Sequence, residues 1–311
     1  MFPKADRKEG IFMPKIGISS YCLASLLEKG EMDLPEVMQW AKDSGADHLE
    51  LVPIGYTLLD NEELCRRVLE KSQELSLPLS NYAISADVLN EDPEERRAEI
   101  RRIQTHVDVA ARLGIPLMRH DIASSARPRE TDTPVDFEKE FFMMAEAATE
   151  VADYAARYGI TTMVENHGFF VNGSDRILRL VEAVNRPNFK MCLDTGNLLC
   201  VDEPPETSIR KCMPYAAMIH IKDFYVRKKQ QLSGLNGPFD CKAEGWFESL
   251  GGRMLRGAVL GQGDIDMTAV VEAIRDSGYA GCISLEFEGI EDSRRGTYTG
   301  LQTAKNLFAE T

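Results

Sequence analysis

Residues 161–168 have the sequence TTMVENHG, in which a short apolar run ends in a glutamate and, two residues later, a histidine. Three further segments share this plan, and each places a potential metal ligand where a buried strand would emerge into solvent. They are FKMCLDTGN (189–197), AAMIHIKD (216–223) and GCISLEFEG (281–289), so that the candidate ligands are Glu165, Asp194, His220 and Glu286. Strand ends of this kind converge in a barrel of parallel strands, whose C-terminal rim holds the active site.

Outward from these segments, short apolar runs alternate with amphipathic stretches, which is typical of βα repeats with a parallel sheet. The predicted strands are residues 15–19, 48–51, 78–83, 116–120, 161–165, 189–193, 216–221 and 281–286. Helices predicted at 34–44, 93–113, 137–158 and 266–277 are each followed by a glycine, a common helix stop. Eight strands close a compact barrel, so we predict an α/β fold, a (β/α)8 TIM barrel. No low-complexity linker divides the chain, and we expect one domain over residues 1–311.

One long loop breaks this rhythm after the seventh predicted strand. Residues 224–263 are rich in glycine and aromatic residues, including Trp246 and Phe247. Loops of this length in compact domains are usually functional or disordered. Since this loop follows the C-terminal end of a strand, we interpret it as a lid over the active site, with an insertion of no function as the alternative.

The composition excludes several classes of protein. Hydrophobic residues make up 43% of the 311 residues, which suffices for a large core, and no apolar run reaches the roughly 20 residues of a membrane span. The formal charge of −14, without a basic stripe, argues against nucleic-acid binding. Seven scattered cysteines without a CxxC pair suit a reducing cytosol, and residues 1–17 lack the apolar region of a secretory signal. We expect a cytoplasmic protein that binds neither nucleic acid nor membrane.

Three carboxylates and one imidazole form a ligand set that suits Mn, Mg, Co or Zn. Taken singly, each residue has an ordinary structural alternative, such as a helix cap for Glu165, a turn for Asp194 or a buried, hydrogen-bonded side chain for His220. Taken together, they leave successive strands at one half of the same rim. Three carboxylates packed there would repel each other, and a divalent cation would remove that cost.

Period-two alternation along a strand identifies neighbours that share the inner face. It places Lys222 beside His220, Glu288 beside Glu286, and His167 beside Glu165. At the end of the fourth strand, His120 and Asp121 are candidate substrate contacts, with Arg119 beside them. Glu50, at the end of the second strand, is a candidate of the same kind. For both strand ends, a salt bridge at the rim is the alternative. Asp264, in GQGDID, is expected to cap the next helix.

The segments VENHG, LDTGN, IHIKD and SLEFEG, in this order, resemble the sugar phosphate isomerase/epimerase group of xylose-isomerase-like TIM barrels, over about residues 15–308. The resemblance implies one divalent ion, Mn first, held by the four ligands above. It also implies that Glu165 and Glu286 are an acid/base pair that moves a proton beside a carbonyl through a metal-bound enediolate. The candidate substrate contacts are His120, His167, Asn197, Lys222, Arg227, Trp246 and Glu288.

Two positions depart from the ketose 3-epimerases of this group. Asn197 stands where they have a histidine, and Val226 stands where they have an arginine, with Arg227 one residue further on. The sequence therefore favours a metal-dependent sugar isomerase or epimerase, with a lyase that dehydrates an inosose or a 3-keto-sugar as the alternative, since Lys222 could assist the departure of hydroxide. A DNA-repair endonuclease of this fold would need more than five histidines, and intact ligands argue against a non-catalytic sugar sensor. The expected partner is a small carbohydrate, and a homo-oligomer is left open.

Overall fold

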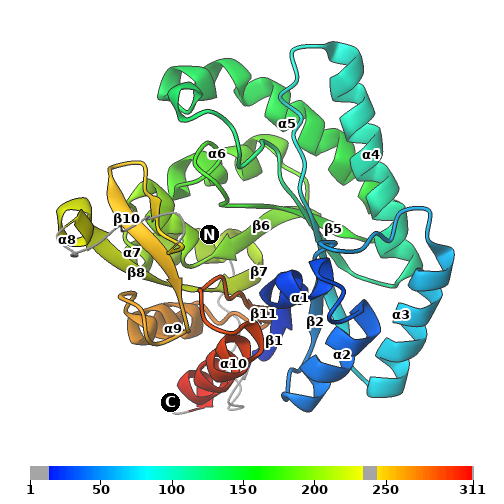
Figure 1. The fold of residues 1–311 in the computed structure, drawn as a ribbon. Helices are drawn as coiled ribbons and strands as arrows, with labels where there is room; N and C mark the ends of the chain where they lie inside the picture. The colour runs from blue at the N-terminus through cyan, green and yellow to red at the C-terminus, as the bar shows by residue number, and fades with distance from the viewer. Residues whose placement is uncertain (1–13, 234–243, 310–311) are drawn as a thin grey trace.

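The computed structural model describes residues 14–233 and 244–309. Eight parallel strands close into a barrel in the order β1-β11-β7-β6-β5-β4-β3-β2 (Figure 1). They are β1 (Lys15–Ser19), β2 (Leu49–Leu51), β3 (Leu79–Ile84), β4 (Leu117–His120), β5 (Thr161–Glu165), β6 (Phe189–Asp194), β7 (Ala216–Ile221) and β11 (Cys282–Leu285). The (β/α)8 barrel predicted from the sequence is confirmed, and each predicted strand boundary lies within about one residue of the observed one.

Helices surround the barrel and cover its outer face (Figure 1). The longer ones are α2 (Leu34–Asp43), α3 (Glu62–Leu75), α4 (Pro93–Arg112), α5 (Pro134–Ala156), α6 (Ser174–Val184), α7 (Pro205–Cys212), α9 (Met267–Asp276) and α10 (Ser293–Ala309), and α1 (Ala24–Glu28) is a single short turn. At α9 the N-cap is Asp266, whose side chain accepts from the Ala269 amide. The predicted cap Asp264 is therefore wrong; its carboxylate pairs with Arg227 instead.

The segment after β7 is more ordered than predicted. Within residues 224–263, β8 (Asp223–Lys228), β9 (Phe247–Glu248) and β10 (Arg253–Ala258) form a three-stranded antiparallel sheet in the order β8-β10-β9, with the short helix α8 (Lys229–Ser233) at its side. This small sheet lies beside the barrel, at the left of Figure 1. Part of the predicted loop, residues 234–243, lies outside the described residues.

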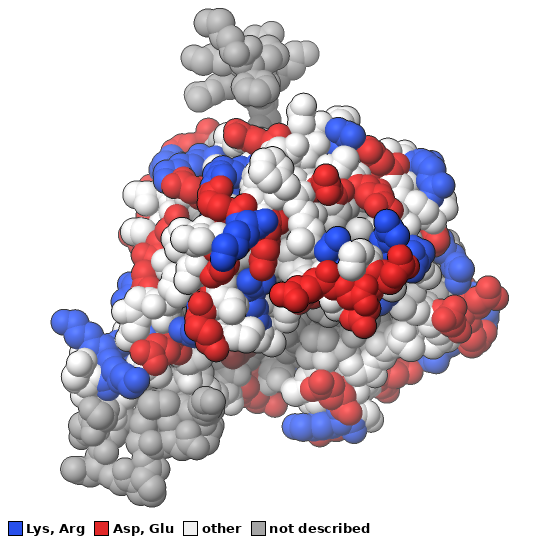
Figure 2. All heavy atoms as spheres, turned by 90° about the horizontal axis from the view of Figure 1, so that it is seen from above, with Lys and Arg blue, Asp and Glu red and all other residues white. Residues whose placement is uncertain are grey.

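The barrel interior is layered by the alternation of its strands. Met163, Cys192 and Met218 form an apolar layer inside the barrel, and the polar residues of the site follow them toward the C-terminal strand ends. Outside, the strands and helices share the main hydrophobic core. Acidic and basic side chains are interspersed over the face shown in Figure 2. None of the described helices is long and apolar enough to cross a bilayer.

Candidate metal centre and active site

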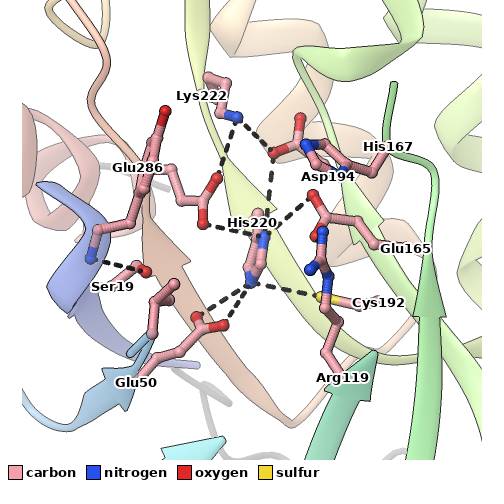
Figure 3. A network of polar contacts seen from close by, with 12 residues as sticks. Ser19, Glu50, Arg119, Glu165, His167, Cys192, Asp194, His220, Lys222 and Glu286 are labelled. Carbon is pink, nitrogen blue, oxygen red and sulfur yellow. Dashed lines mark hydrogen bonds and ion pairs between the residues drawn. The ribbon is translucent and has the colours of Figure 1, made fainter. Parts of the chain in front are cut away.

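Four side chains from neighbouring strands meet at the C-terminal end of the barrel. Glu165 ends β5, Asp194 ends β6, His220 lies in β7 and Glu286 follows β11. One ligand atom from each of these residues lies within 4.8 Å of the others, and all four side chains are buried. Figure 3 shows them converging around the His220 ring. The proximity expected from the four sequence segments is therefore present.

The orientation of His220 leaves one ring nitrogen free to act as a ligand. Its Nε2 lies 3.0 Å from Glu50 Oε1, and since a carboxylate only accepts, Nε2 carries the proton. The other nitrogen, Nδ1, lies 3.4 Å from Oε1 of both Glu165 and Glu286 and has no hydrogen-bond partner. A buried polar atom without a partner is costly, so this nitrogen is suited to a cation.

Asp194 is oriented in a similar way. Its Oδ1 accepts hydrogen bonds from the backbone amides of Gly196 and Asn197, at 2.8 and 2.6 Å. Its Oδ2 has no hydrogen-bond partner and faces His220 Nδ1 at 4.0 Å. Burial raises the pKa of Asp194 to about 6; Lys222 opposes this shift, and the carboxylates of Glu165 and Glu286 add to it.

The two glutamates lie on either side of His220 (Figure 3), and each is held by a cation. Arg119 Nε donates to Glu165 Oε2 at 2.6 Å, and Lys222 Nζ lies 3.0 Å from Glu286 Oε2. Burial alone would raise the pKa of Glu165, but Arg119 and His220 outweigh it and hold the pKa well below its usual range. The pKa of Glu286 is lowered likewise, because His220 and Lys222 outweigh its burial.

The charges of this cluster fit a divalent cation. The carboxylates that surround His220, Arg119 and Lys222 are Glu50, Asp121, Glu165, Asp194, Glu286 and Glu288. Arg119 and Lys222 are the only permanent cations among these described residues, so negative charge is in excess. Buried carboxylates at such distances are stable only with compensation. His220 Nδ1 and Asp194 Oδ2, which lack hydrogen-bond partners although Lys222 Nζ lies 3.4 Å from Oδ2, indicate where a cation would sit. The residues present therefore fit the metal that the sequence predicts.

A cavity of about 200 Å³ is lined by three of the four candidate ligands, Glu165, His220 and Glu286. One wall is apolar and comes from Val52, Pro53 and Ile54 after β2. The lining also includes His167, whose Nδ1 lies 3.0 Å from Asp121 Oδ1. A cavity with both polar and apolar lining residues is suited to a small polyhydroxylated molecule.

The candidate substrate contacts divide into two groups. His167, Lys222 and Glu288 line the cavity. Asn197 lies beside it, because its amide donates to Glu165 Oε1 at 3.0 Å and accepts from Lys222 Nζ at 3.3 Å. The other three, His120, Arg227 and Trp246, do not line the cavity in this structure.

Each of these three has a physical reason to lie elsewhere. His120 is in register with Ile84 and points toward the helix layer, where its ring lies 6.4 Å from that of Phe189. Arg227 pairs with Asp264 at 2.6 Å on the small sheet. Trp246 is buried against Leu232 and Met254. The prediction that these residues contact the substrate is not supported by where their side chains lie.

Four residues of the site were missed or left undecided by the sequence. Arg119 and Asp121 face the cavity in place of His120, which alternation along β4 could have indicated once the inner face was known. Glu50 reaches His220 from β2, on the other side of the barrel. Tyr21 lines the cavity and donates to Glu288 Oε2 at 3.2 Å, and no pattern around it signals this role.

Comparison with known proteins finds relatives that share one fold and are named as epimerases or as dehydratases. The sequence profile of the xylose isomerase-like TIM barrel family matches residues 38–307. Inosose dehydratase from Lacticaseibacillus casei is 28% identical over 163 residues, covering 50% of this chain and 50% of that protein. The match thus spans about half the length of this curated relative.

Two solved structures superimpose on nearly the whole chain. D-allulose 3-epimerase from Methylomonas sp. has a TM-score of 0.70 at 18% identity, with 95% of this chain and 98% of that chain covered. A probable 3-DHS dehydratase involved in petrobactin synthesis from Bacillus anthracis has a TM-score of 0.71 at 15% identity, with 94% and 99% covered. At these identities the similarity shows a shared fold.

Proposed function

Because the chain belongs to the xylose isomerase-like TIM barrel family, we propose that it is a divalent-metal-dependent isomerase or epimerase of a sugar or keto-sugar. The observation that carries this proposal is the set of four buried ligand atoms within 4.8 Å of one another, next to a cavity of about 200 Å³. We propose Mn²⁺ as the first choice of ion, with Mg²⁺, Co²⁺ and Zn²⁺ as alternatives that the same donors accept.

Glu165, Asp194, His220 and Glu286 would hold the ion, which would polarise a substrate carbonyl and stabilise the negative charge that develops on its oxygen. Glu165 and Glu286 would also move the proton at the adjacent carbon. They lie on opposite sides of His220, so that one can remove a proton from one face of the substrate while the other protonates the opposite face. Arg119 and Lys222 hold the two carboxylates in these positions.

The cavity favours a substrate without a phosphate group. Of the cations that line it, Arg119 already faces Glu165 and Asp121, and Lys222 already faces Asp194, Glu286 and Glu288. A phosphate dianion brought among these carboxylates would be repelled. The hydroxyl groups of a neutral polyol can instead donate to them and form a hydrogen bond with His167.

Backbone groups that could bind a phosphate are also occupied. In TIM barrels a phosphate site is often formed by the loops after the last strands. Here the amides of Gly261, Gly263 and Ile265 all donate to the buried carboxylate of Asp223, the first residue of β8. The Asp223 carboxylate thus occupies the backbone amides that could otherwise bind the phosphate of a substrate.

Dehydration is a second candidate, and one observation favours it. Lys222 Nζ lies in the cavity wall, 3.0 Å from Glu286 Oε2, so that an acid stands next to the proposed base. Once Glu286 has removed a proton, Lys222 could protonate a hydroxyl on the neighbouring carbon and release water. The partial similarity to an inosose dehydratase agrees with this alternative.

One experiment tests both candidates. The Mn²⁺-loaded protein is incubated in D₂O with free ketoses, inososes and 3-keto-glycosides, and with the matching ketose phosphates, and the products are followed by NMR and mass spectrometry. We expect solvent deuterium at the carbon beside the carbonyl of a neutral substrate. A product that differs from the substrate only by this deuterium indicates isomerisation or epimerisation, and a product that has also lost water indicates dehydration. A protein that exchanges no proton on any of these compounds would contradict the proposed chemistry, and a preference for the phosphates would contradict the neutral substrate.

A further inference from the structure

Glu50 is a fully buried carboxylate inside the barrel, and nothing in the proposed chemistry requires it to touch the substrate. It lies in β2, in register with Ser19 of β1 and Asn81 of β3, and its exposed fraction is 0%. Both of its oxygens lie 3.0 Å from His220 Nε2, which comes from β7 across the barrel. A buried charge is retained only where a specific partner compensates it, and here the partner is the proposed metal ligand.

A relay of hydrogen bonds fixes the position of Glu50 in turn. The Asn81 side chain donates from Nδ2 to Glu50 Oε1 at 2.9 Å. Its Oδ1 accepts from the backbone amide of Arg119 at 3.1 Å, which settles the orientation of the amide group. Asn81 is fully buried as well. The relay therefore runs from the backbone of β4 through β3 and β2 to the imidazole of β7, and His220 is its end point.

We propose that Glu50 is a positioning residue of the metal centre, which keeps the proton on Nε2 of His220 and directs Nδ1 toward the carboxylates of Glu165, Asp194 and Glu286. This inference rests on the proposed metal-dependent function. A carboxylate that accepts from the remote ring N–H of a metal-bound histidine fixes the tautomer of that histidine and raises its basicity. Losing such a carboxylate typically weakens metal binding about 10- to 100-fold. Glu50 acts through His220 and not on the substrate.

A purely structural ion pair would behave differently. If Glu50 only compensated a charged imidazole inside the barrel, removing it would lower the stability of the protein without changing the metal affinity of the molecules that remain folded. Metal affinity measured on folded protein thus separates the two roles, and enzymatic activity is not needed for the distinction.

The test uses Glu50→Gln, Glu50→Ala and the control Met218→Leu, a substitution of similar volume in the apolar layer below the site. Each chelator-stripped variant is titrated with Mn²⁺ by calorimetry and with Co²⁺ by visible absorption, after circular dichroism shows that it is folded. We expect the Mn²⁺ dissociation constant to rise about 10- to 100-fold in Glu50→Ala and by a smaller factor in Glu50→Gln, whose amide oxygen still accepts from Nε2. The Co²⁺ spectrum should change in both, and Met218→Leu should match the wild type.

Dissociation constants within about twofold of the wild type in the Glu50 variants, with unchanged Co²⁺ spectra, would overturn this inference and leave the metal site in place. If Glu50→Ala does not fold, Glu50→Gln decides alone by the same criterion, since it preserves shape. Wild-type protein that binds neither ion would overturn the proposed metal-dependent function itself, and with it the role of Glu50.

Discussion

Each of the two glutamates proposed to move the proton is held by a cation of its own. Arg119 contacts Glu165 at 2.6 Å and Lys222 contacts Glu286 at 3.0 Å, so both carboxylates are kept ionised and fixed in direction. An ionised and fixed carboxylate can accept a proton without first reorganising, and this is what a general base requires.

Replacing either glutamate by glutamine should separate metal binding from proton transfer. In Glu165→Gln and in Glu286→Gln the amide oxygen can still face the ion, but it cannot accept the proton. We therefore expect the metal to be retained and turnover to fall by about two orders of magnitude or more, measured with the substrate found in the D₂O screen. Arg227→Lys serves as the control, because Arg227 lies outside the cavity, and it should keep near-wild-type turnover. If both Gln variants bind metal and turn over normally, neither glutamate is the base, and His167 or Lys222 should be tested.

The sequence indicated the four proposed ligands but did not decide how Glu50 and Arg119 contact them. The ligands follow apolar runs at strand ends, which is a local pattern, whereas Glu50 and Arg119 meet them only after the barrel has closed. The direction of the His120 side chain could not be predicted for a related reason. On β4 either Arg119 and Asp121 or His120 must face inward, and only the register with β5, which pairs Arg119 with Met163, decides between them.

At the scale of elements, helix α4 is tied to strand β3 by a buried histidine whose pKa is shifted. Arg102 donates to His106 Nε2 at 3.1 Å, so Nδ1 carries the proton and donates to the Tyr82 hydroxyl oxygen at 2.8 Å. Burial, followed by the charge of Arg102, lowers the pKa of His106 to about 4. In the unfolded chain this group titrates near 6.5.

Acid should therefore weaken the folded state through His106. As the pH falls below about 6.5 the unfolded chain takes up this proton first, and the loss of stability continues until the pH reaches about 4, amounting to at most about 3 kcal/mol. We expect the melting temperature of chelator-treated wild type to fall more steeply between pH 6.5 and 4.5 than that of His106→Gln, which carries no titrating group. Parallel pH profiles of the two proteins would show that His106 does not contribute.

One carboxylate, Asp202, helps to hold the hairpin formed by β9 and β10 against the barrel, beside the bonds from Arg129 to Ser249 and Glu248 and from the Leu250 amide to Cys200. Asp202 accepts from the Ser249 hydroxyl at 2.8 Å, from Arg253 Nε at 2.6 Å and from the Gly251 amide. Its own φ is +61°, a left-handed conformation that asparagine adopts more readily than alanine.

Asp202→Ala should release this hairpin without unfolding the barrel. Losing these hydrogen bonds costs about 1–3 kcal/mol locally, so we expect amide exchange in residues 247–253 to accelerate roughly 5- to 100-fold while the barrel strands exchange at the wild-type rate. Asp202→Asn keeps the backbone conformation and one acceptor, and should lie in between. Uniform acceleration across the barrel would instead indicate that Asp202 stabilises the whole fold.

The small sheet could not be predicted from the sequence, because its strands lack the buried apolar pattern of the barrel strands. β9 spans only Phe247–Glu248, β10 is interrupted by two arginines and a glycine, and the apolar run of β8 covers only three residues, so none of the three has the pattern of a barrel strand. The barrel strands, by contrast, are short buried runs between amphipathic helices, and their pattern was sufficient to place all eight.

At the scale of the whole molecule, excess negative charge and the proposed metal centre would act on stability together. The chain carries a formal charge of −14, and six carboxylates surround the site. Added cations would therefore stabilise the fold in two ways, by general screening of the surface and by specific binding at the site. Surface screening depends on ionic strength, whereas specific binding depends on which ion is present and on the four proposed ligands.

Binding that is specific to the folded state raises stability by an amount set by the ratio of free ion to dissociation constant. At a hundredfold excess over that constant the gain is about 2.7 kcal/mol, which corresponds to a rise of several degrees in the melting temperature. We expect Mn²⁺ to produce this rise in the wild type and EDTA to abolish it, while NaCl of matched ionic strength produces little. Asp194→Asn, which keeps the two backbone hydrogen bonds through its amide oxygen but loses the charge, should lose most of the shift. An equal rise with Mn²⁺ in Asp194→Asn would mean that the ion acts on the charged surface and not at the four ligands.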